Sequence, residues 1–160
     1  QTHSENIFMA KKILKVLVIL VLLIVLGIGG MFGWMKYEQS KYAATAVPFI
    51  QKVVPEIAQW NSEVFKSYMV PEALTAMPDA DLTKLVNWLK KLGSLQSLGE
   101  PSFVHVFKGV NLLSGGQTII TYTIPAKFDA GDATITMRLL EQGKSFKIFH
   151  FNVNSKALIG

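Results

Sequence analysis

The sequence predicts an α+β protein, in which a single N-terminal transmembrane helix is followed by helices packed on a curved, four-stranded antiparallel sheet. Three observations predict this fold class. Residues 16–35 carry no charged side chain, apolar residues then recur at helical spacing as far as Gly93, and the chain after Glu100 is rich in Val, Ile, Thr, Phe and Tyr. A membrane span, a helical layer and a meander of strands follow in that order.

The apolar run at residues 16–35 reads VLVILVLLIVLGIGGMFGWM. As a helix it spans about 30 Å, which is the thickness of the hydrocarbon layer of a bilayer. Residues that anchor at headgroup depth flank it: Lys11, Lys12 and Lys15 before it, and Trp34, Lys36 and Tyr37 at its end. We therefore expect a transmembrane helix over 13–36, a short cytoplasmic N-terminus over 1–12 and a periplasmic domain over 37–160.

A cleavable signal peptide is the alternative for this segment, because KKILK followed by an apolar stretch resembles the start of a secretory leader. The run is longer than the roughly 7–15 apolar residues of such leaders, and no small-x-small cleavage site follows it, which favours an uncleaved anchor. Residues 1–8 precede Met9 in MAKKILK, which resembles a natural translation start. We expect residues 1–8 to be an expression remnant or a genuine extension, outside the fold.

The composition excludes several classes of function. The chain has 160 residues, no cysteine, a net charge of +5 and a mean hydropathy of +0.33. Without cysteine there is no disulfide scaffold, thiolate zinc site or cysteine nucleophile. Four lysines and Glu5 give the first 36 residues three of the five net charges, so the basic balance concerns membrane orientation. Arg138 is the single arginine and the lysines are scattered, so we expect no nucleic-acid partner.

Gly29 and Gly33 form a small-xxx-small pair in the second half of the apolar run. Because they are four residues apart, they share one helical face on which another transmembrane helix can approach closely, and we expect a helix–helix contact there. The alternative is that these glycines reflect only the higher frequency of glycine in membrane helices.

The segment 37–69 carries apolar residues at three- and four-residue steps, which predicts an amphipathic helix. Pro48 and Pro55 each remove a backbone donor and disfavour helix in the residue before them. We therefore expect one helix to end or kink near one of the prolines and a second to start near Glu56.

The elements after residue 69 are predicted from the residues at their ends, namely prolines, a helix N-cap and glycines in turns. The stretch 69–78, with two prolines, predicts a loop, and a helix is expected from Asp79, as its N-cap, to Gly93. Four strands of an antiparallel meander follow: 101–110, 117–128, 132–142 and 144–154. Tight turns are expected between them at Gly115-Gly116, 130–132 and 142–144.

Two stretches of this α+β part carry a family resemblance. KKLGSLQSLGEPSF and GDATITMRLLEQGKSFKIFHFNVNS resemble the cystatin-like cone of the nuclear-transport-factor-two superfamily, over about residues 42–154. The chain has Phe146 where tryptophan is common in the last strand of that family. The resemblance implies a cone of helices on a curved sheet. It implies no activity, because the superfamily includes enzymes, binding modules and scaffolds.

A pocket inside such a cone would draw on His105, Tyr122 and His150. On strict alternation, His105 shares a face with Phe103, His150 shares a face with Ile148, and Tyr122 lies between them, so the three side chains are expected to converge. The alternative, which we favour, is that both histidines are structural. Asp129 and Asp132 flank a turn, where Asp is expected for local hydrogen bonding. The histidine spacing predicts no metal site, and we expect no cofactor.

Threonines alternate with apolar residues along two adjacent strands, at Thr121, Thr123, Thr134 and Thr136. They predict a threonine-lined face opposite an apolar one. The simpler interpretation is a solvated outer face. The more specific one is a docking face, since uncharged threonines lose water more readily than Lys or Glu at an interface.

These features predict a non-catalytic, single-pass protein of the bacterial inner membrane. Its expected partners are the lipid bilayer and integral membrane subunits of a larger complex, for which it acts as an accessory, assembly or stabilising subunit. Two alternatives stay open. One is a membrane-tethered binding module that holds a small apolar ligand or lipid in the cone pocket, and the other is an isomerase or hydrolase that uses the pocket histidines.

Overall fold

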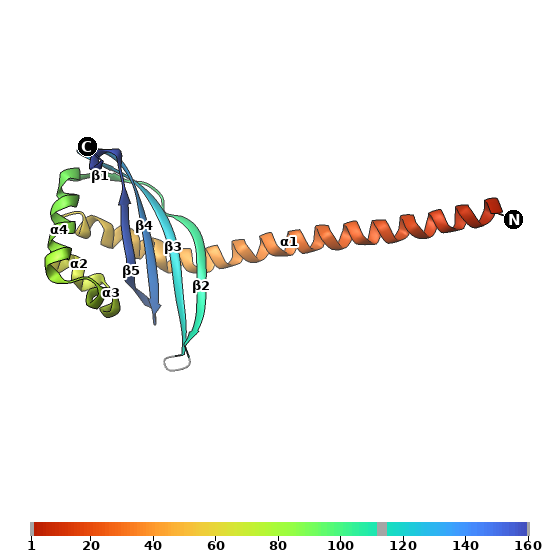
Figure 1. Cartoon of the computed structure of the whole chain (residues 1–160), viewed down its shortest axis with the longest axis horizontal. Helices are drawn as coiled ribbons and strands as arrows, with labels where there is room; N and C mark the ends of the chain where they lie inside the picture. The colour runs from red at the N-terminus through yellow and green to blue at the C-terminus, as the bar shows by residue number, and fades with distance from the viewer. Residues whose placement is uncertain (1, 112–114, 160) are drawn as a thin grey trace. The chain divides into compact units, whose positions relative to one another are not determined.

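The computed structural model describes residues 2–111 and 115–159, and it confirms the α+β prediction. A long apolar N-terminal helix is followed by short helices and a curved antiparallel sheet, which has five strands among the described residues (Figure 1). The elements are α1 (Thr2–Ile57), α2 (Ser62–Tyr68), α3 (Pro71–Ala76), α4 (Asp79–Leu89), η1 (Lys90–Leu92), β1 (Leu95–Leu98), β2 (Ser102–Asn111), β3 (Gly115–Phe128), β4 (Gly131–Gln142), β5 (Ser145–Asn154) and η2 (Lys156–Leu158).

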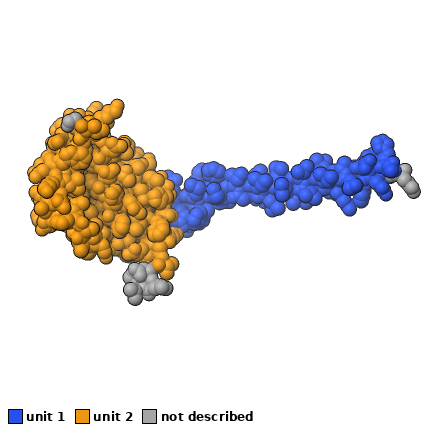
Figure 2. All heavy atoms as spheres, in the orientation of Figure 1, with its two compact units in different colours: residues 1–41 blue, residues 42–160 orange. Residues whose placement is uncertain are grey.

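The chain divides into two compact units, residues 1–41 and residues 42–160 (Figure 2). In the first unit, every large apolar side chain between Val16 and Met35 is 50–69% exposed. Within the described chain, α1 is the one helix long and apolar enough to cross a membrane. Because none of this stretch is buried, it is not the core helix of a soluble protein, whereas a signal sequence near the N-terminus could pass the same test of length and hydropathy.

The prediction at the prolines is met in part: α1 ends at Ile57, close to Pro55, but the next helix starts at Ser62 rather than near Glu56. Both Pro48 and Pro55 lie inside α1. The reason is burial in the second unit. One face of the helix is almost fully buried there, through Tyr42, Ala46, Ile50, Val53, Val54 and Ile57. The four buried Val and Ile side chains contribute about 6–12 kcal/mol together, which equals or exceeds the roughly 6 kcal/mol that two internal prolines cost.

The segment predicted as a loop, 69–78, contains the short helix α3, which starts with Pro71 at its first position. The next helix begins where predicted, but Pro78 occupies the N-cap position and Asp79 is the first helical residue. The Asp79 carboxylate instead lies 2.9 Å from the Lys66 ammonium on α2. The helical part ends as predicted at Gly93, which has φ +76° and ψ −152°, a conformation that glycine tolerates best.

The sheet contains the four predicted strands, β2 to β5, paired as an antiparallel meander. It also contains β1, a strand that the sequence did not indicate. Both β1 and β2 pair with β3, β1 along Ala126–Phe128 and β2 along Gly115–Thr123. Gly115 and Gly116, expected in a turn, are the first two residues of β3, while residues 112–114 before them lie outside the described chain.

One face of the sheet packs against the helices of the second unit. In Figure 1, helices α2 to α4 lie together on one side of the strands. The core joins these helices and the end of α1 to alternate residues of the strands, among them Ile120, Tyr122 and Ile124 of β3 and Ile135, Met137 and Leu139 of β4. The threonines lie on the opposite face of β3 and β4, and they are not part of this core.

Candidate functional sites

The two strand histidines do not lie on the core face. Between Phe103 and His105, strand β2 advances two residues while β3 advances one, so Val104 is the extra residue of a β-bulge. The bulge puts Phe103 opposite Tyr122, with ring centroids 5.9 Å apart, and puts His105 opposite Thr121. Strict alternation therefore fails at Val104, and His105 is exposed on the other face from Phe103.

A second bulge displaces His150 in the same way. On β4, Arg138 pairs with His150 of β5, and the next residue, Leu139, pairs with Ile148. Phe149 therefore has no partner on β4 and is the extra residue of a β-bulge. Ile148 stays in the core while His150 is exposed. The expected convergence of both histidines with Tyr122 is thus contradicted by the register of the sheet.

The bulges assemble a different group of side chains. The pairing runs from His105 to Thr121, from Thr121 to Arg138, and from Arg138 to His150, so these four residues form one row across β2, β3, β4 and β5. The Thr121 hydroxyl is 3.5 Å from His105 Nε2, and Thr121 is only 5% exposed. The Arg138 guanidinium carbon lies 5.4 Å from the centroid of the Phe149 ring. We call this group the basic row.

Arg138 is not neutralised by the protein around it. Its Nε is buried and has no hydrogen-bond partner among the described residues, and no described carboxylate lies within ion-pair distance of it. A buried donor that lacks an acceptor costs about 1–3 kcal/mol, and more when it is charged. The guanidinium is therefore a site where an added anion would gain both a charge partner and a hydrogen bond.

Tyr122 is a core residue. It is 1% exposed, and its hydroxyl has no hydrogen-bond partner among the described residues. Burial raises the pKa of this hydroxyl above its ordinary value of 10. A general acid or base needs access to substrate and a pKa near the working pH, and Tyr122 has neither property.

The four threonines lie on the sheet face away from the core helices. Thr123 of β3 pairs directly with Thr136 of β4, and Thr134 pairs with Pro125. Thr134 is exposed, Thr123 and Thr136 are partly exposed, and Thr121 is buried beside the basic row. The register places three charged residues of β3 and β4 on this face: Arg138 opposite Thr121, and Lys127 opposite Asp132 at the other end. The pairs between them, Thr123 with Thr136 and Pro125 with Thr134, are uncharged.

An apolar groove lies between helices α2 to α4 and strand β5. Its volume is about 380 Å³, and its apolar wall includes Phe65, Met69, Met77, Leu85, Phe149 and Phe151. Glu72 and His150 are its ionisable lining residues. This combination of an apolar wall and few polar groups is typical of small-molecule sites, which measure about 300–1,000 Å³. Sequence reasoning missed the groove because its walls come from four separate elements.

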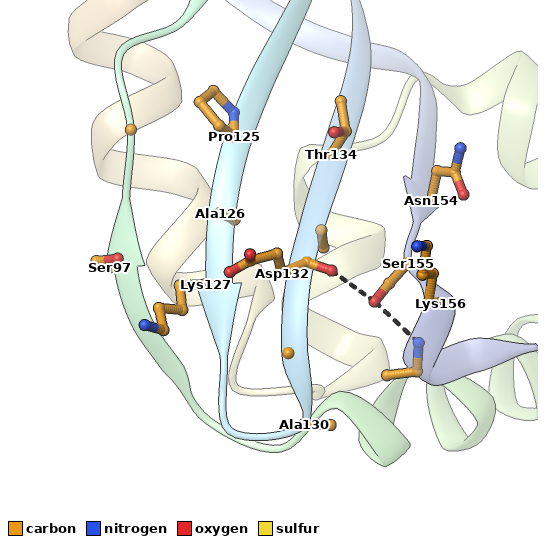
Figure 3. A pocket seen from close by; sticks show the side chains of 14 residues that line it. Ser97, Pro125, Ala126, Lys127, Ala130, Asp132, Thr134, Asn154, Ser155 and Lys156 are labelled. Carbon is orange, nitrogen blue, oxygen red and sulfur yellow. Dashed lines mark hydrogen bonds between the residues drawn. The ribbon is translucent and has the colours of Figure 1, made fainter. Parts of the chain in front are cut away.

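A second hollow, of about 760 Å³, lies on the sheet near the start of β4 and the end of β5 (Figure 3). Within it, the Ser155 hydroxyl donates to the Asp132 carbonyl at 2.7 Å and accepts from the Ala157 amide at 3.3 Å. These contacts tie η2 to the sheet. The hollow is lined by small and polar residues, and its hydrogen bonds serve the fold.

The turn aspartate Asp129 has a structural role, but its side-chain hydrogen bonds are not the local ones predicted for it: both partners are distant in sequence. It accepts a hydrogen bond from the Ser94 amide at 2.7 Å and another from the Gln96 side chain. It thereby joins the turn before β4 to the start of β1. In the described residues, no group of three or more His, Asp or Glu side chains is placed to hold a metal ion.

Gly29 and Gly33 lie in α1, where a Cβ added at either position would meet no other atom within 4 Å. The same holds for Gly27 and Gly30. The chain itself therefore provides no contact for this glycine face, and larger side chains would fit there without strain.

Comparison with known proteins adds no assignment to these sites. The chain matches no protein-family model, and no curated protein shows significant similarity to it. The resemblance to the cystatin-like cone remains a prediction from the sequence motifs, alongside the observed α+β architecture.

Proposed function

We propose that this protein is a single-pass membrane protein that serves, without catalysis, as an accessory, assembly or stabilising subunit of a larger complex in the bacterial inner membrane. The observation that carries the proposal is the apolar stretch Val16–Met35, whose large side chains are all 50–69% exposed. Exposing sixteen large apolar side chains to water would be very costly, whereas the hydrocarbon layer of a bilayer accommodates them. The same helix, α1, supplies core residues from Tyr42 to Ile57, so the anchor and the folded domain share one element.

The proposal includes an orientation and a fold family. Lys11, Lys12 and Lys15 before the apolar stretch favour a cytoplasmic N-terminus, which puts the α+β domain in the periplasm. The helices on one face of a curved sheet support assignment of residues 42–154 to the cystatin-like cone of the nuclear-transport-factor-two superfamily. Members of a superfold carry many functions, so the role proposed here depends on the anchor and on the surfaces.

Two surfaces are available for partner subunits. One is the glycine face at Gly29 and Gly33, where open space allows another transmembrane helix to pack closely. The other is the threonine face of the sheet, with Thr123 and Thr136 at its centre. Such a face is easily desolvated, and Arg138 within it provides one directional charged contact.

The glycine face gives the sharpest test of the accessory role. Native mass spectrometry of the protein extracted in mild detergent should detect co-purifying integral subunits. A Gly29→Leu, Gly33→Leu double variant should lose them, because the larger side chains keep the partner helix away. Gly27→Leu is the matched control, since it lies on another face of the helix and its added side chain also meets open space. A wild-type protein that runs as a clean monomer would contradict the proposal.

A second candidate function is a membrane-tethered binding module. The observation that favours it is the apolar groove between α2–α4 and β5, which differs from the cone interior that the sequence suggested. In this role the anchor keeps the groove close to a source of apolar ligands. The two functions are compatible, because the groove and the glycine face lie on different elements.

A further inference from the structure

Strand β2 lies at an open margin of the sheet. In Figure 1 it is the outermost strand on its side, and β3 is the one described strand that pairs with it. After the bulge at Val104, the pairing is regular from His105 to Asn111. A strand that pairs on one side directs alternate backbone N–H and C=O groups to the other side. The free side of β2 is therefore a row of backbone groups to which another strand can add.

This edge also carries exposed apolar side chains. Val104 is 48% exposed, Phe107 is 55% exposed and Val110 is 87% exposed. Lysine often protects such an edge from strand addition. In β2, however, the Lys108 ammonium lies 6.0 Å from the centroid of the buried Tyr42 ring, so its charge is directed toward the core. A long apolar edge strand of this kind favours pairing with another chain.

The other margins of the described sheet are covered or short. On β5, Met69 forms a parallel bridge with Ile148, and the Val70 amide donates to the Ile148 carbonyl at 2.9 Å. The bulge at Phe149 interrupts the same strand. Strand β1 has four residues and pairs irregularly. Pairing between copies through two different edges would extend into a filament, whereas pairing of β2 with itself closes after two chains. The fold therefore favours a second copy of this chain as the partner of β2.

We propose that β2 pairs antiparallel with β2 of a second copy, with Phe107 opposite Phe107 of that copy, so that the two sheets become one. This register also places Val104 opposite Val110 of the other chain, so all three exposed apolar residues face apolar residues. Lys108 lies opposite Val106, so the two ammonium groups do not face each other. The inference goes beyond the accessory role, because the pairing needs no other subunit. The proposed anchor favours it by raising the effective concentration of copies at the membrane.

Disulfide cross-linking of the full chain in phosphatidylcholine vesicles tests the pairing, because the wild type has no cysteine. Phe107→Cys should form a covalent dimer on mild oxidation. Residues directly opposite in a strand pair have Cα atoms about 4.5–5.5 Å apart, within the range that a disulfide needs. Asn152→Cys is the matched control, because Asn152 is exposed on the other outer strand, β5. It should cross-link at least about tenfold more slowly. Equal rates for the two variants would overturn the proposal.

The register is tested with Val104→Cys and Val110→Cys. In the proposed pairing, equivalent positions of the two chains are six residues apart along the strands at either site, or about 20 Å, which is too far for a disulfide. Neither variant should therefore cross-link alone, whereas a mixture of the two should give the mixed dimer. If each variant cross-links with itself as fast as Phe107→Cys does, the proposal is overturned.

The glycine face of α1 could also bring two copies together, and a background substitution separates the two contacts. Cross-linking of Phe107→Cys should persist in the Gly29→Leu, Gly33→Leu chain, because β2 does not depend on that face. Its loss there would assign the contact to the apolar helix and overturn the proposal.

A charge at the centre of the pairing should prevent it. Phe107→Lys puts two ammonium groups directly opposite each other, at a side chain exposed enough for the fold to tolerate lysine. In native mass spectrometry of the detergent-extracted chain, it should raise the dissociation constant of the dimer at least about tenfold. Ile159→Lys, at another exposed apolar residue, should leave it unchanged.

Equal weakening by the two lysine variants, or a wild type without dimer in both vesicles and detergent, would overturn the proposal. If Phe107→Lys fails to fold, the cysteine variants still decide the question. A homodimer without other subunits would support the pairing of β2 while it contradicts the accessory role, so the two proposals fail separately.

Discussion

The buried hydroxyl of Tyr122 leads to an unusual stability prediction. Tyr122 is 1% exposed and packs edge-to-face on Phe103, and its hydroxyl has no acceptor or donor partner among the described residues. Burying a hydroxyl without a hydrogen bond costs about 1–3 kcal/mol. Tyr122→Phe removes that cost and keeps the ring. The substitution should therefore raise the free energy of unfolding, whereas most core substitutions lower it.

The expected size of the effect follows from two terms. Removal of the oxygen leaves a void of about 10–15 Å³, roughly the space of one water-sized probe. At about 24 cal/mol per Å³ of cavity, that void costs about 0.3 kcal/mol. The relieved desolvation is several times larger, so Tyr122→Phe should stabilise the domain by about 1–2 kcal/mol near neutral pH.

The difference should grow at alkaline pH. Burial raises the pKa of Tyr122 in the folded protein above 10, so between pH 10 and that raised pKa the unfolded chain loses a proton that the folded chain keeps. The stability contributed by this group is fully present below pH 10 and is lost as the pH rises through the folded pKa. In this window the wild type should lose up to about 1.4 kcal/mol per pH unit relative to Tyr122→Phe.

The assay is denaturant unfolding of the full chain in a neutral detergent, followed by the fluorescence of Trp60 and Trp88. A Trp34→Phe background removes the signal of the apolar helix. Tyr68→Phe is the matched control, because the Tyr68 hydroxyl donates to the Glu56 carboxylate and its loss should destabilise the domain. If Tyr122→Phe lowers the free energy of unfolding by about 1 kcal/mol or more, the hydroxyl has a partner in the folded protein and the reasoning is refuted.

Three further predictions concern other parts of the chain. Gly93→Ala should cost about 1–3 kcal/mol in the same unfolding assay, because Gly93 has φ +76° and an added Cβ would lie 2.7 Å from Asp129; an unchanged midpoint would contradict this geometry. Asp129→Ala should cost about 1 kcal/mol, since it removes the acceptor for the Ser94 amide at 2.7 Å, and a cost below the error of the assay would mean that water replaces it. Leu23→Arg should release the chain from carbonate-washed membranes, because a charge at mid-span costs about 2.5–3.5 kcal/mol. An intact mass that lacks the N-terminal residues through the end of the apolar stretch would instead identify a cleaved signal peptide.

The helical part shows which structural features the sequence can predict. The ends of α4 and η1 follow from local chemistry, namely the acidic first turn at Asp79 and Asp81 and the glycine at position 93, and the prediction is accurate there. The continuation of α1 through Pro48 and Pro55 depends on burial against a sheet that is distant in sequence. Local propensity cannot anticipate that contribution, so the sequence indicated the helix end near Pro55 but not that both prolines lie within the helix.

The sheet shows the same division. Strands β2 to β5 were predicted within two residues of their ends because their composition is strongly biased and because glycines lie at or near the ends of β3, β4 and β5. Strand β1 has the sequence LQSL, and its partly buried residues are Leu95 and Leu98, three apart rather than two. An irregular register accounts for this spacing, since the pairing shifts between Leu95 and Ser97. A strand without alternation gives no pattern to detect.

The position of the two histidines depends on whether burying an imidazole or forming a β-bulge costs more free energy. Strict alternation in FVHVF and KIFHF buries His105 and His150 among phenylalanines, where an imidazole without a partner costs several kcal/mol at the upper end of transfer estimates. A bulge at Val104 or Phe149 instead gives up about one ladder hydrogen bond, or about 0.5–1.5 kcal/mol. The bulge is the cheaper solution in both strands, and it keeps the flanking apolar residues in the core. Each bulge also places its histidine in the same row across the sheet as Arg138. The two bulges that interrupt the alternation of side chains are therefore also what forms the basic row.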